Sequence, residues 1–441
     1  MAAEAPAHHV VRGLTMRTQA PAEGGLRMVA ALLVGVALTM AGSGPLTTLV
    51  SLRLEAMGTA RIAIGAVMAA YFGGLTLGSL FAYKLVLGAG HIRAFAAFAS
   101  MTSAVALAYP LVMHPLSWAV LRLVEGFCMA GIFICVESWL NDRASPATRG
   151  KILALYMMCL YLAQAAGQFL LGLDEGPGQP RVFMFISILM SLAILPVALT
   201  RQAPPTLPDV ASFSPRRLYE ASPLGVVGTV ASGLVLGAVY SLGPVFARRF
   251  AGLEASGAAL FMSALIFGGV LLQWPLGRLS DAFDRRRVII GTMAALAAAA
   301  AALPFLAREG QGALFAAAVL FGGFAFALYP LCVGHTNDHL APRDRVAASG
   351  GLVLAYSVGA TVGPLAGSGA MSAMGAAGLF AYAAGVALLG LLFGLWRMRA
   401  RAPVPAERQG PFQPAPGTTP IAAPLDPRGT QDLPHGAAKV V

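Results

Sequence analysis

The chain has 441 residues, of which 57% are hydrophobic and only 11% charged, and its formal net charge is +11. Soluble domains usually carry about a quarter charged residues, so this composition excludes a water-soluble globular protein and predicts one surrounded by lipid. The basic residues are spread over many short loops, which argues against nucleic-acid binding. The four cysteines lie in apolar segments, so we expect neither a disulfide framework nor a zinc site.

Apolar runs recur along the whole chain, and each of about 20 residues can cross the hydrocarbon core as a helix. Only helices and closed barrels satisfy their backbone groups inside lipid. The first six helices are expected at 28–50, 62–82, 94–113, 116–140, 149–172 and 182–199. Six more are expected at 225–246, 256–276, 288–307, 313–335, 346–370 and 376–396. The predicted fold class is an all-α polytopic membrane protein with twelve transmembrane helices in two six-helix pseudo-repeats.

Polar segments divide the chain into five parts. We expect two six-helix bundles, at 26–199 and 225–398, joined by a cytoplasmic linker at 200–224. Residues 1–25 and the proline-rich residues 399–441 lack apolar periodicity, so both are expected to be disordered, the tail as a solvated extension. Lys and Arg concentrate in the loops on the side of the two termini, which predicts that both termini face the cytoplasm and that the protein lies in the inner membrane.

The two halves also share short motifs. An Asn-Asp pair is followed by Pro and then Arg at identical spacing in 141–149 and in 337–345, and Phe-Gly-Gly occurs at 72–74 and 267–269. Matches at nearly one offset, each joining equivalent helices, favour an internal duplication.

Several motifs resemble the major facilitator superfamily. The loop 277–287, GRLSDAFDRRR, is similar to that family's signature loop, and the segment 122–126, RLVEG, resembles its pattern in the fourth helix. The runs 137–143 and 329–339 resemble its YcaD-type branch. The resemblance covers residues 26–398 and implies two bundles that work by alternating access. Ala82 and Val86 stand where the first half should repeat the loop's Gly and Asp, and the antiporter motif of drug exporters is absent from the 149–172 helix, which weakens a role in drug efflux.

The resemblance also implies a conformational latch. Asp281 would lie against the start of the 149–172 helix, and Asp338 would accept an arginine; such contacts form in one state and break in the other. The expected gating residues are Gly277, Asp281, Arg285, Arg286, Arg93, Asp142, Arg149, Asp338 and Arg345.

Charges inside apolar helices are functional candidates, because a charge at membrane depth costs several kcal/mol unless it is paired or hydrated. Arg122 and Glu125, three positions apart, share a helix face and can pair. The pair either neutralises itself or faces a cavity where it binds an anionic group or a proton. Glu137 is either a gate or a proton site. The candidates for the substrate and proton pathway are Arg122, Glu125, Glu137, Tyr156, Gln164, Tyr240, Tyr329 and His335.

The function expected from these observations is secondary active transport of a small organic solute, coupled to protons. An uncoupled facilitator of the same fold is the alternative, and a membrane enzyme acting on lipid is a remote one. We expect no enzymatic activity, because no nucleophile–base pair or metal cluster stands out, and the spacing of His335 and His339 indicates a polar helix end rather than a metal site. No cofactor, catalytic residue or nucleic-acid partner is expected; the partners are the solute, protons and membrane lipid, and the protein is expected to be a monomer.

Overall fold

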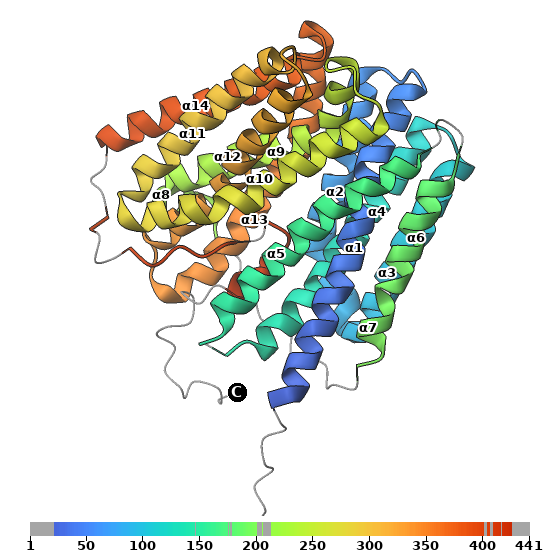
Figure 1. The fold of residues 1–441 in the computed structure, drawn as a ribbon. Helices are drawn as coiled ribbons and strands as arrows, with labels where there is room; N and C mark the ends of the chain where they lie inside the picture. Colours follow the sequence, from blue (N-terminus) through green and yellow to red (C-terminus); the bar gives the residue numbers. More distant parts are fainter. Residues whose placement is uncertain are drawn as a thin grey trace, which may run out of the picture.

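The computed structural model describes residues 22–145, 147–174, 176, 179–200, 205, 213–400, 404–405, 409–415 and 417–425. The described chain forms long helices in two bundles that lie side by side (Figure 1). Twelve helices are long and apolar enough to span a membrane, which confirms the predicted fold class. The expected disorder of residues 1–25 falls largely outside the described residues, although the first helix already begins at Ala22.

The amino-terminal bundle contains α1 (Ala22–Ala56), α2 (Arg61–Ala89), α3 (His91–Ala108) with the 3-10 turn η1 (Tyr109–Leu111), α4 (Pro115–Arg143), α5 (Arg149–Gly167) with η2 (Gln168–Leu173), and α6 (Arg181–Leu192) with α7 (Ile194–Ala198). The short helix α8 (Pro215–Ala221) lies in the linker. The carboxy-terminal bundle contains α9 (Pro223–Arg249), α10 (Ala255–Ala282), α11 (Arg285–Leu306), α12 (Gln311–Asn337), α13 (Pro342–Met374) and α14 (Gly378–Ala400).

Glycines allow equivalent helices to approach closely in both bundles. In α2, a Cβ at Gly74 would collide with the backbone of Leu123 in α4. In α10, a Cβ at Gly268 would collide with the backbone of Val319 in α12. Helix association in lipid relies on such close packing rather than on a hydrophobic driving force. Gly74 is the second glycine of the Phe-Gly-Gly motif in α2, and Gly268 is the first glycine of the motif in α10. Both motifs therefore serve close packing of equivalent helix pairs, in registers that differ by one residue.

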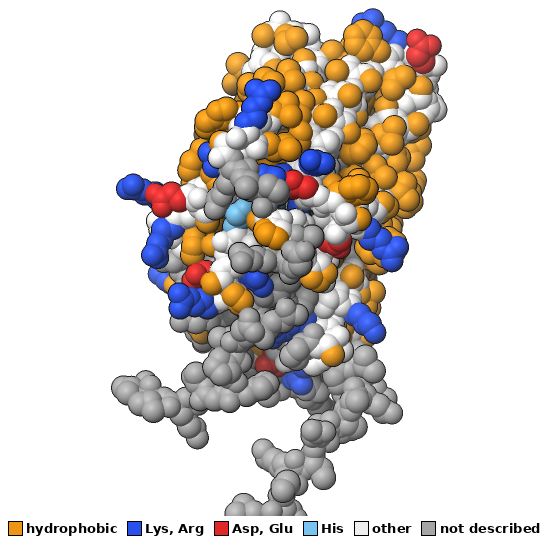
Figure 2. All heavy atoms as spheres, turned by 90° about the vertical axis from the view of Figure 1, so that its left-hand side faces the viewer, with side chains coloured by type: hydrophobic (Ala, Val, Ile, Leu, Met, Phe, Trp, Pro, Cys, Tyr) orange, Lys and Arg blue, Asp and Glu red, His pale blue; other side chains and the backbone are white. Residues whose placement is uncertain are grey.

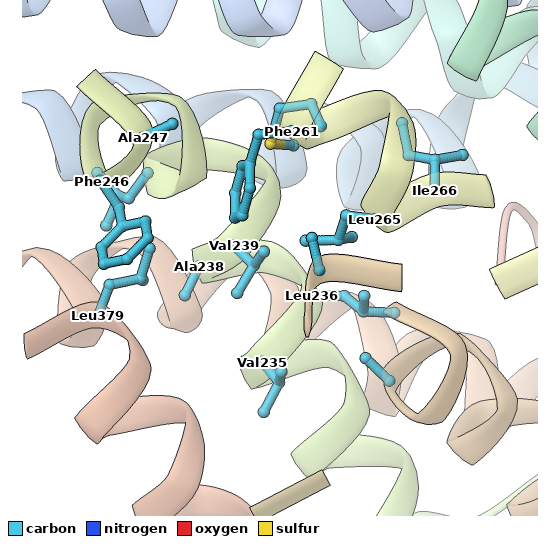
Figure 3. Close-up of a cluster of buried hydrophobic side chains, with 14 of the residues drawn as sticks. Val235, Leu236, Ala238, Val239, Phe246, Ala247, Phe261, Leu265, Ile266 and Leu379 are labelled. Carbon is cyan, nitrogen blue, oxygen red and sulfur yellow. The ribbon is translucent and has the colours of Figure 1, made fainter. Parts of the chain in front are cut away.

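The core of the carboxy-terminal bundle is aliphatic and aromatic (Figure 3). Phe246 of α9 packs on Phe380 of α14 with ring centroids 4.6 Å apart, and Phe261 of α10 lies beside both. Many large apolar side chains on the outer faces are exposed, including Leu271 and Leu389. Such an outer surface suits contact with lipid chains rather than with water.

The bundles meet along α2–α13, α5–α10 and α1–α9. We call one end of the molecule the tail face: it carries the α2–α3, α4–α5, α10–α11 and α12–α13 loops and the described tail residues. The opposite face carries the α1–α2, α9–α10 and α13–α14 loops. Figure 2 views the molecule from the left-hand side of Figure 1; Lys and Arg side chains gather in its middle and lower part, whereas the upper part is mostly hydrophobic.

The described part of the tail differs from the expectation of a solvated, disordered extension. Residues 420–425 form a 3-10 helix, η4 (Pro420–Leu425), that packs against α13 and α4. Leu425 is fully buried and Ile421 is 8% exposed. The proline-rich composition concealed this short apolar run, which is too short to produce a periodic pattern but long enough to fill a gap between helices.

Candidate functional site

A cavity of about 130 Å³ lies between the two bundles. Both bundles and the tail contribute to its wall. Its polar and aromatic lining residues include Ser43, Thr47, Tyr71, Tyr161, Gln164, Tyr240, Phe326, Tyr329, Tyr356 and Thr418. Three expected pathway residues, Gln164, Tyr240 and Tyr329, therefore lie in one cavity.

The cavity wall is rich in aromatic rings and hydroxyl groups. Phe326 lies edge-on to Tyr161 and Tyr240, with centroid distances of 5.1 and 5.7 Å. The Tyr240 hydroxyl donates a hydrogen bond of 3.0 Å to Oε1 of Gln164, which joins α9 of one bundle to α5 of the other. None of the described residues lining the cavity carries a formal charge. Such a wall suits a flat solute with few charges and several hydrogen-bonding groups.

A buried ion pair lies directly behind this wall. Arg122 Nη1 is 2.9 Å from Glu125 Oε2, and both side chains are completely buried. The Tyr109 hydroxyl donates a 3.1 Å hydrogen bond to the same carboxylate oxygen. Arg122 also donates to the Thr47 hydroxyl at 3.3 Å, and its guanidinium lies 4.3 Å from the centroid of the Tyr71 ring. Because Thr47 and Tyr71 line the cavity, the pair is one side chain away from the cavity.

One carboxylate oxygen of this pair stands out. Among the described residues, no donor reaches Glu125 Oε1 although the atom is buried. A buried charged oxygen without a partner is costly, whereas a protonated one can donate a hydrogen bond of its own. The arrangement can therefore hold a proton as well as an ion pair.

Glu137 lies nearer the tail face on the same helix, 12 residues after Glu125. It is fully buried, and Tyr156 donates a 3.0 Å hydrogen bond to its Oε1. Thr418 and Thr419 of the tail donate to its two oxygens. The two expected pathway residues Glu137 and Tyr156 are thus in contact, and the tail completes their site.

The opposite face is closed by contacts between the bundles. Glu55 at the end of α1 pairs with Arg248 and Arg249 at the end of α9, at 3.2 Å for the first. Arg61 donates a 2.7 Å hydrogen bond to the Met371 carbonyl of α13. The cavity is therefore separated from this face by a layer of interbundle contacts.

The signature loop makes only part of the expected latch. Arg285 bridges Asp338 and Asp281, at 2.5 and 2.9 Å, as expected for Asp338. Asp281, however, accepts a 2.7 Å hydrogen bond from the backbone of Phe412 in the tail, where the start of α5 was expected. The tail occupies this position, and the resemblance noted from the sequence, which covers residues 26–398, gave no expectation for this segment.

The remaining gating candidates lie around the tail face. Gly277 lies under the ring of Phe412, and Arg286 pairs with Asp284 at 2.8 Å. Arg345 donates a 3.1 Å hydrogen bond to the Asn337 carbonyl. Three further candidates belong to the amino-terminal bundle: Arg93 is exposed, Asp142 lies 3.5 Å from Arg143, and Arg149 begins α5.

Asp284 caps the start of α11. Its Oδ1 accepts a 3.0 Å hydrogen bond from the Arg286 backbone, and the Arg286 side chain binds both carboxylate oxygens. Burial acts to raise the pKa of Asp284, but these hydrogen bonds and the positive charge of Arg286 outweigh it, so that the pKa is lowered.

His335 is not part of the central cavity. It is buried at the end of α12, where its ring packs on His339 with centroids 4.6 Å apart. Its surroundings form a separate small pocket with Ser222, which caps the start of α9, and Arg397 of α14. This location differs from the expected pathway position. Within the described residues, no group of three or more His, Cys, Asp or Glu could hold a metal ion.

Sequence reasoning missed Tyr161, Tyr356 and the tail threonines. Tyr161 precedes Gln164 by three positions, so helical spacing places it on the same face of α5, and that signal could have identified it. Tyr356 of α13 packs against Tyr329 with centroids 5.2 Å apart, a contact without a local sequence signal.

Comparisons with known proteins give consistent results. The family model of the Major Facilitator Superfamily matches residues 31–272 and 225–430. The MFS-type transporter YcaD of Salmonella heidelberg is 30% identical over 349 residues, which cover 77% of this chain and 87% of the relative, and that of Salmonella agona matches equally. A crystal structure of the nucleoside transporter NupG has a TM-score of 0.70 at 13% identity and covers 85% of this chain and all of NupG. A bacterial homologue of the human lysosomal transporter Spinster, described as inward-facing and occupied, has a TM-score of 0.70 at 16% identity. The match covers 89% of this chain and 99% of the homologue.

Proposed function

The chain belongs to the major facilitator superfamily, and we propose that this transporter moves a small organic solute by alternating access, coupled to protons. The observation that carries the proposal is the cavity between the bundles, with a buried ion pair directly behind its wall. In alternating access, two bundles rock about a central site so that it faces one side of the membrane at a time. We further propose that the tail face is cytoplasmic and that the protein resides in the inner membrane, since basic loop residues favour that side.

The Arg122–Glu125 pair supports proton coupling. An adjacent arginine favours the charged carboxylate and burial favours the protonated one, so a small change in hydration or in the Arg122 position alters the balance. Thr47 and Tyr71 connect Arg122 to the cavity, so a solute bound there can shift the guanidinium. Movement of Arg122 away from Glu125 would promote proton uptake at Glu125. This links occupancy of the cavity to protonation.

The lining supports a solute with an aromatic or heteroaromatic ring and hydroxyl or amide groups. Several tyrosines supply ring faces and hydroxyls, and Gln164 supplies an amide. The NupG fold neighbour is described as a nucleoside transporter, and nucleosides have this chemistry, which makes them one class to test. The second candidate function is facilitated diffusion, in which the buried pair serves packing alone.

The test is transport into proteoliposomes that contain the purified full chain. A panel of radiolabelled nucleosides and aromatic amino acids is offered with and without an imposed pH gradient. We expect at least one solute to accumulate only with the gradient, and Glu125→Gln to abolish accumulation while still allowing equilibration. Glu309→Gln, which alters an exposed carboxylate of the opposite face, is the matched control and should transport normally.

Uptake of a solute that reaches equilibrium only, at equal rates in the parent and in Glu125→Gln, would establish the uncoupled facilitator instead. Accumulation that survives in Glu125→Gln would move the coupling site elsewhere, with Glu137 as the next carboxylate to replace.

A further inference from the structure

The tail returns to the molecule and binds the signature loop through its backbone. The Gly410 amide donates a 3.1 Å hydrogen bond to Asp338 Oδ1, and the Gly410 carbonyl accepts one of 2.8 Å from Arg285. The Phe412 amide donates to Asp281 at 2.7 Å. Three charged side chains, Asp281, Arg285 and Asp338, are thus hydrogen-bonded to the backbone of two tail residues, Gly410 and Phe412.

The same stretch lies between the bundles. The Phe412 ring covers Gly277 at the end of α10, where any Cβ would collide with it. The next residue, Gln413, lies over Gly150 in the first turn of α5, where a Cβ would be 3.1 Å from its Oε1. The tail therefore passes between the end of α10 and the start of α5, two elements that must approach each other if this face is to close.

Further along, the tail reaches the cavity itself. Gly417 and Thr418 form part of the cavity wall, and Thr418 and Thr419 donate hydrogen bonds to the buried Glu137. The helix η4 then packs on α13 and α4, so that each bundle contacts the same short segment. Threonine hydroxyls at a buried carboxylate and apolar side chains in an apolar gap are complementary chemistry, not incidental contact.

The size of the remaining cavity indicates what this segment does. Pockets for small organic ligands usually measure about 300–1,000 Å³. With the tail in place the cavity measures about 130 Å³, and Gly417 and Thr418 form part of its wall on the tail face. The opposite face is closed by Glu55, Arg248, Arg249 and Arg61. The central cavity alone is thus smaller than a typical solute site. A second cavity of about 330 Å³, which shares Met157 and Tyr161 with it, lies between α5 and α10 and is bounded by Phe412 and Pro414 of the tail.

We propose that the tail residues 409–415 and 417–425 are a plug that binds in cis between the bundles, restricts the central cavity from the tail face and keeps the start of α5 apart from the end of α10. The segment must leave before solute can reach the cavity from that face and before the bundles can close there. The site built by Glu137, Asp281, Arg285 and Asp338 is accordingly a peptide-binding site whose ligand is the chain's own tail.

The test measures access to the cavity and requires neither a known solute nor a pH gradient. The four native cysteines are replaced by serine, and Ser43, a small cavity-lining residue, is changed to cysteine. The purified full chain in detergent is labelled with a fluorescent maleimide. The same measurement is made on a chain that ends at Pro405 and on a matched control that ends at Leu425 and retains the segment.

We expect the chain ending at Pro405 to label about tenfold faster than the full chain, because the plugged state then no longer dominates the population. The chain ending at Leu425 should label like the full chain. A synthetic peptide of residues 409–425, added to the chain ending at Pro405, should slow labelling again. The same peptide with Thr418→Val and Thr419→Val should not do so at the same concentration.

Equal labelling rates in the full chain and in the chain ending at Pro405 would overturn the proposal, and so would a peptide without effect on the shorter chain. If the shorter chain does not elute as a folded protein, the decision passes to the full chain with Thr418→Val and Thr419→Val, in which faster labelling supports the plug and unchanged labelling refutes it. Because no transport is measured, failure of the proposed proton coupling cannot be mistaken for failure of the plug.

Discussion

Thr419 donates a hydrogen bond to Glu137, a residue 282 positions earlier in the chain. Thr418 binds the other carboxylate oxygen, and Tyr156 shares that oxygen with it. Glu137 was expected to be either a gate or a proton site. In the plug proposed above one carboxylate would serve both roles, since protonation of Glu137 would remove the charge to which the two tail hydroxyls donate.

Replacing this carboxylate should loosen the tail. Glu137→Gln leaves one acceptor oxygen where the two tail hydroxyls now bind two. A hydrogen bond to a charged acceptor contributes about 1.5–3 kcal/mol and one to a neutral acceptor about 1 kcal/mol, so the change should weaken tail binding by about 1 kcal/mol, or roughly fivefold in the bound population. Labelling of a cysteine at Ser43 should therefore accelerate by about that factor. Tyr156→Phe removes a donor to the same carboxylate but spares the tail contacts, so it should label at the parent rate. A rate in Glu137→Gln no higher than in Tyr156→Phe would show that the carboxylate does not retain the tail.

The buried ion pair should reveal itself by non-additive stability. Arg122→Met leaves Glu125 charged and buried without its partner, and such changes typically cost about 3–5 kcal/mol. Adding Glu125→Gln removes the charge and keeps an acceptor for Tyr109, so the double variant should regain most of the loss. Melting temperatures measured in detergent should be highest for the parent, lowest for Arg122→Met and close to the parent for the double variant.

The matched control for that experiment is an exposed pair. Arg216 and Glu220 lie 2.9 Å apart on α8 with side chains 89% and 59% exposed. Exposed pairs contribute about 0–1 kcal/mol, so Arg216→Met should scarcely change the melting temperature. A double variant at 122 and 125 that melts below Arg122→Met would contradict the account of the pair.

Gly65 should control closure of the opposite face. A Cβ at Gly65 in α2 would collide with Ser368 and the Pro364 carbonyl of α13, both in the other bundle. Gly65→Ala should therefore disfavour the closed opposite face and speed labelling of a cysteine at Thr47 from that side. Gly73→Ala is the matched control in the same helix, since within the described part of the chain a Cβ there meets only the Leu123 side chain, at 3.9 Å. Equal labelling of the two variants would mean that α2 and α13 do not form this gate.

The charge of Asp284 should make the stability of the folded protein depend on pH in the acidic range. Its pKa is lowered in the folded protein, so its stabilising contribution is present above the ordinary aspartate value of about 3.9 and is lost as the pH falls through the folded value. Asp284→Asn should lower the melting temperature at pH 7, and the difference from the parent should shrink as the pH is reduced below about 4. A constant difference over that range would refute the role of its charge.

The fold could be predicted from sequence because the signal for each helix is local. A run of apolar residues long enough to span lipid forces a helix, so all twelve spans were expected within several residues of their observed positions. The Arg122–Glu125 contact was also local, since a spacing of three on one helix brings side chains together. The repeated Phe-Gly-Gly motif predicted an internal duplication, and both copies lie in close helix contacts, although the glycine that meets the neighbouring backbone is the second in α2 and the first in α10.

The parts that sequence did not reveal depend on long-range contacts. Nothing near Thr418 indicates that it lies beside Glu137, and nothing near Asp281 indicates that a tail amide replaces α5 as its partner. For His335 the prediction was wrong in another way. As a buried polar side chain in a spanning helix it was expected to line the cavity, but it faces a small pocket within its own bundle. Which face of a helix meets the cavity is set by packing against distant helices.

The most direct test of alternating access between the bundles is a pair of distance distributions from spin labels. One pair of labels joins exposed positions on the opposite face, Ile62 in α2 and Met374 in α13, and the other joins Lys151 in α5 and Phe283 after α10 on the tail face. The account predicts two populations for each pair, with the opposite-face distance lengthening as the tail-face distance shortens, and a shift in that direction when the chain ends at Pro405. A single unchanging distance for each pair, or lengthening of both together, would contradict it.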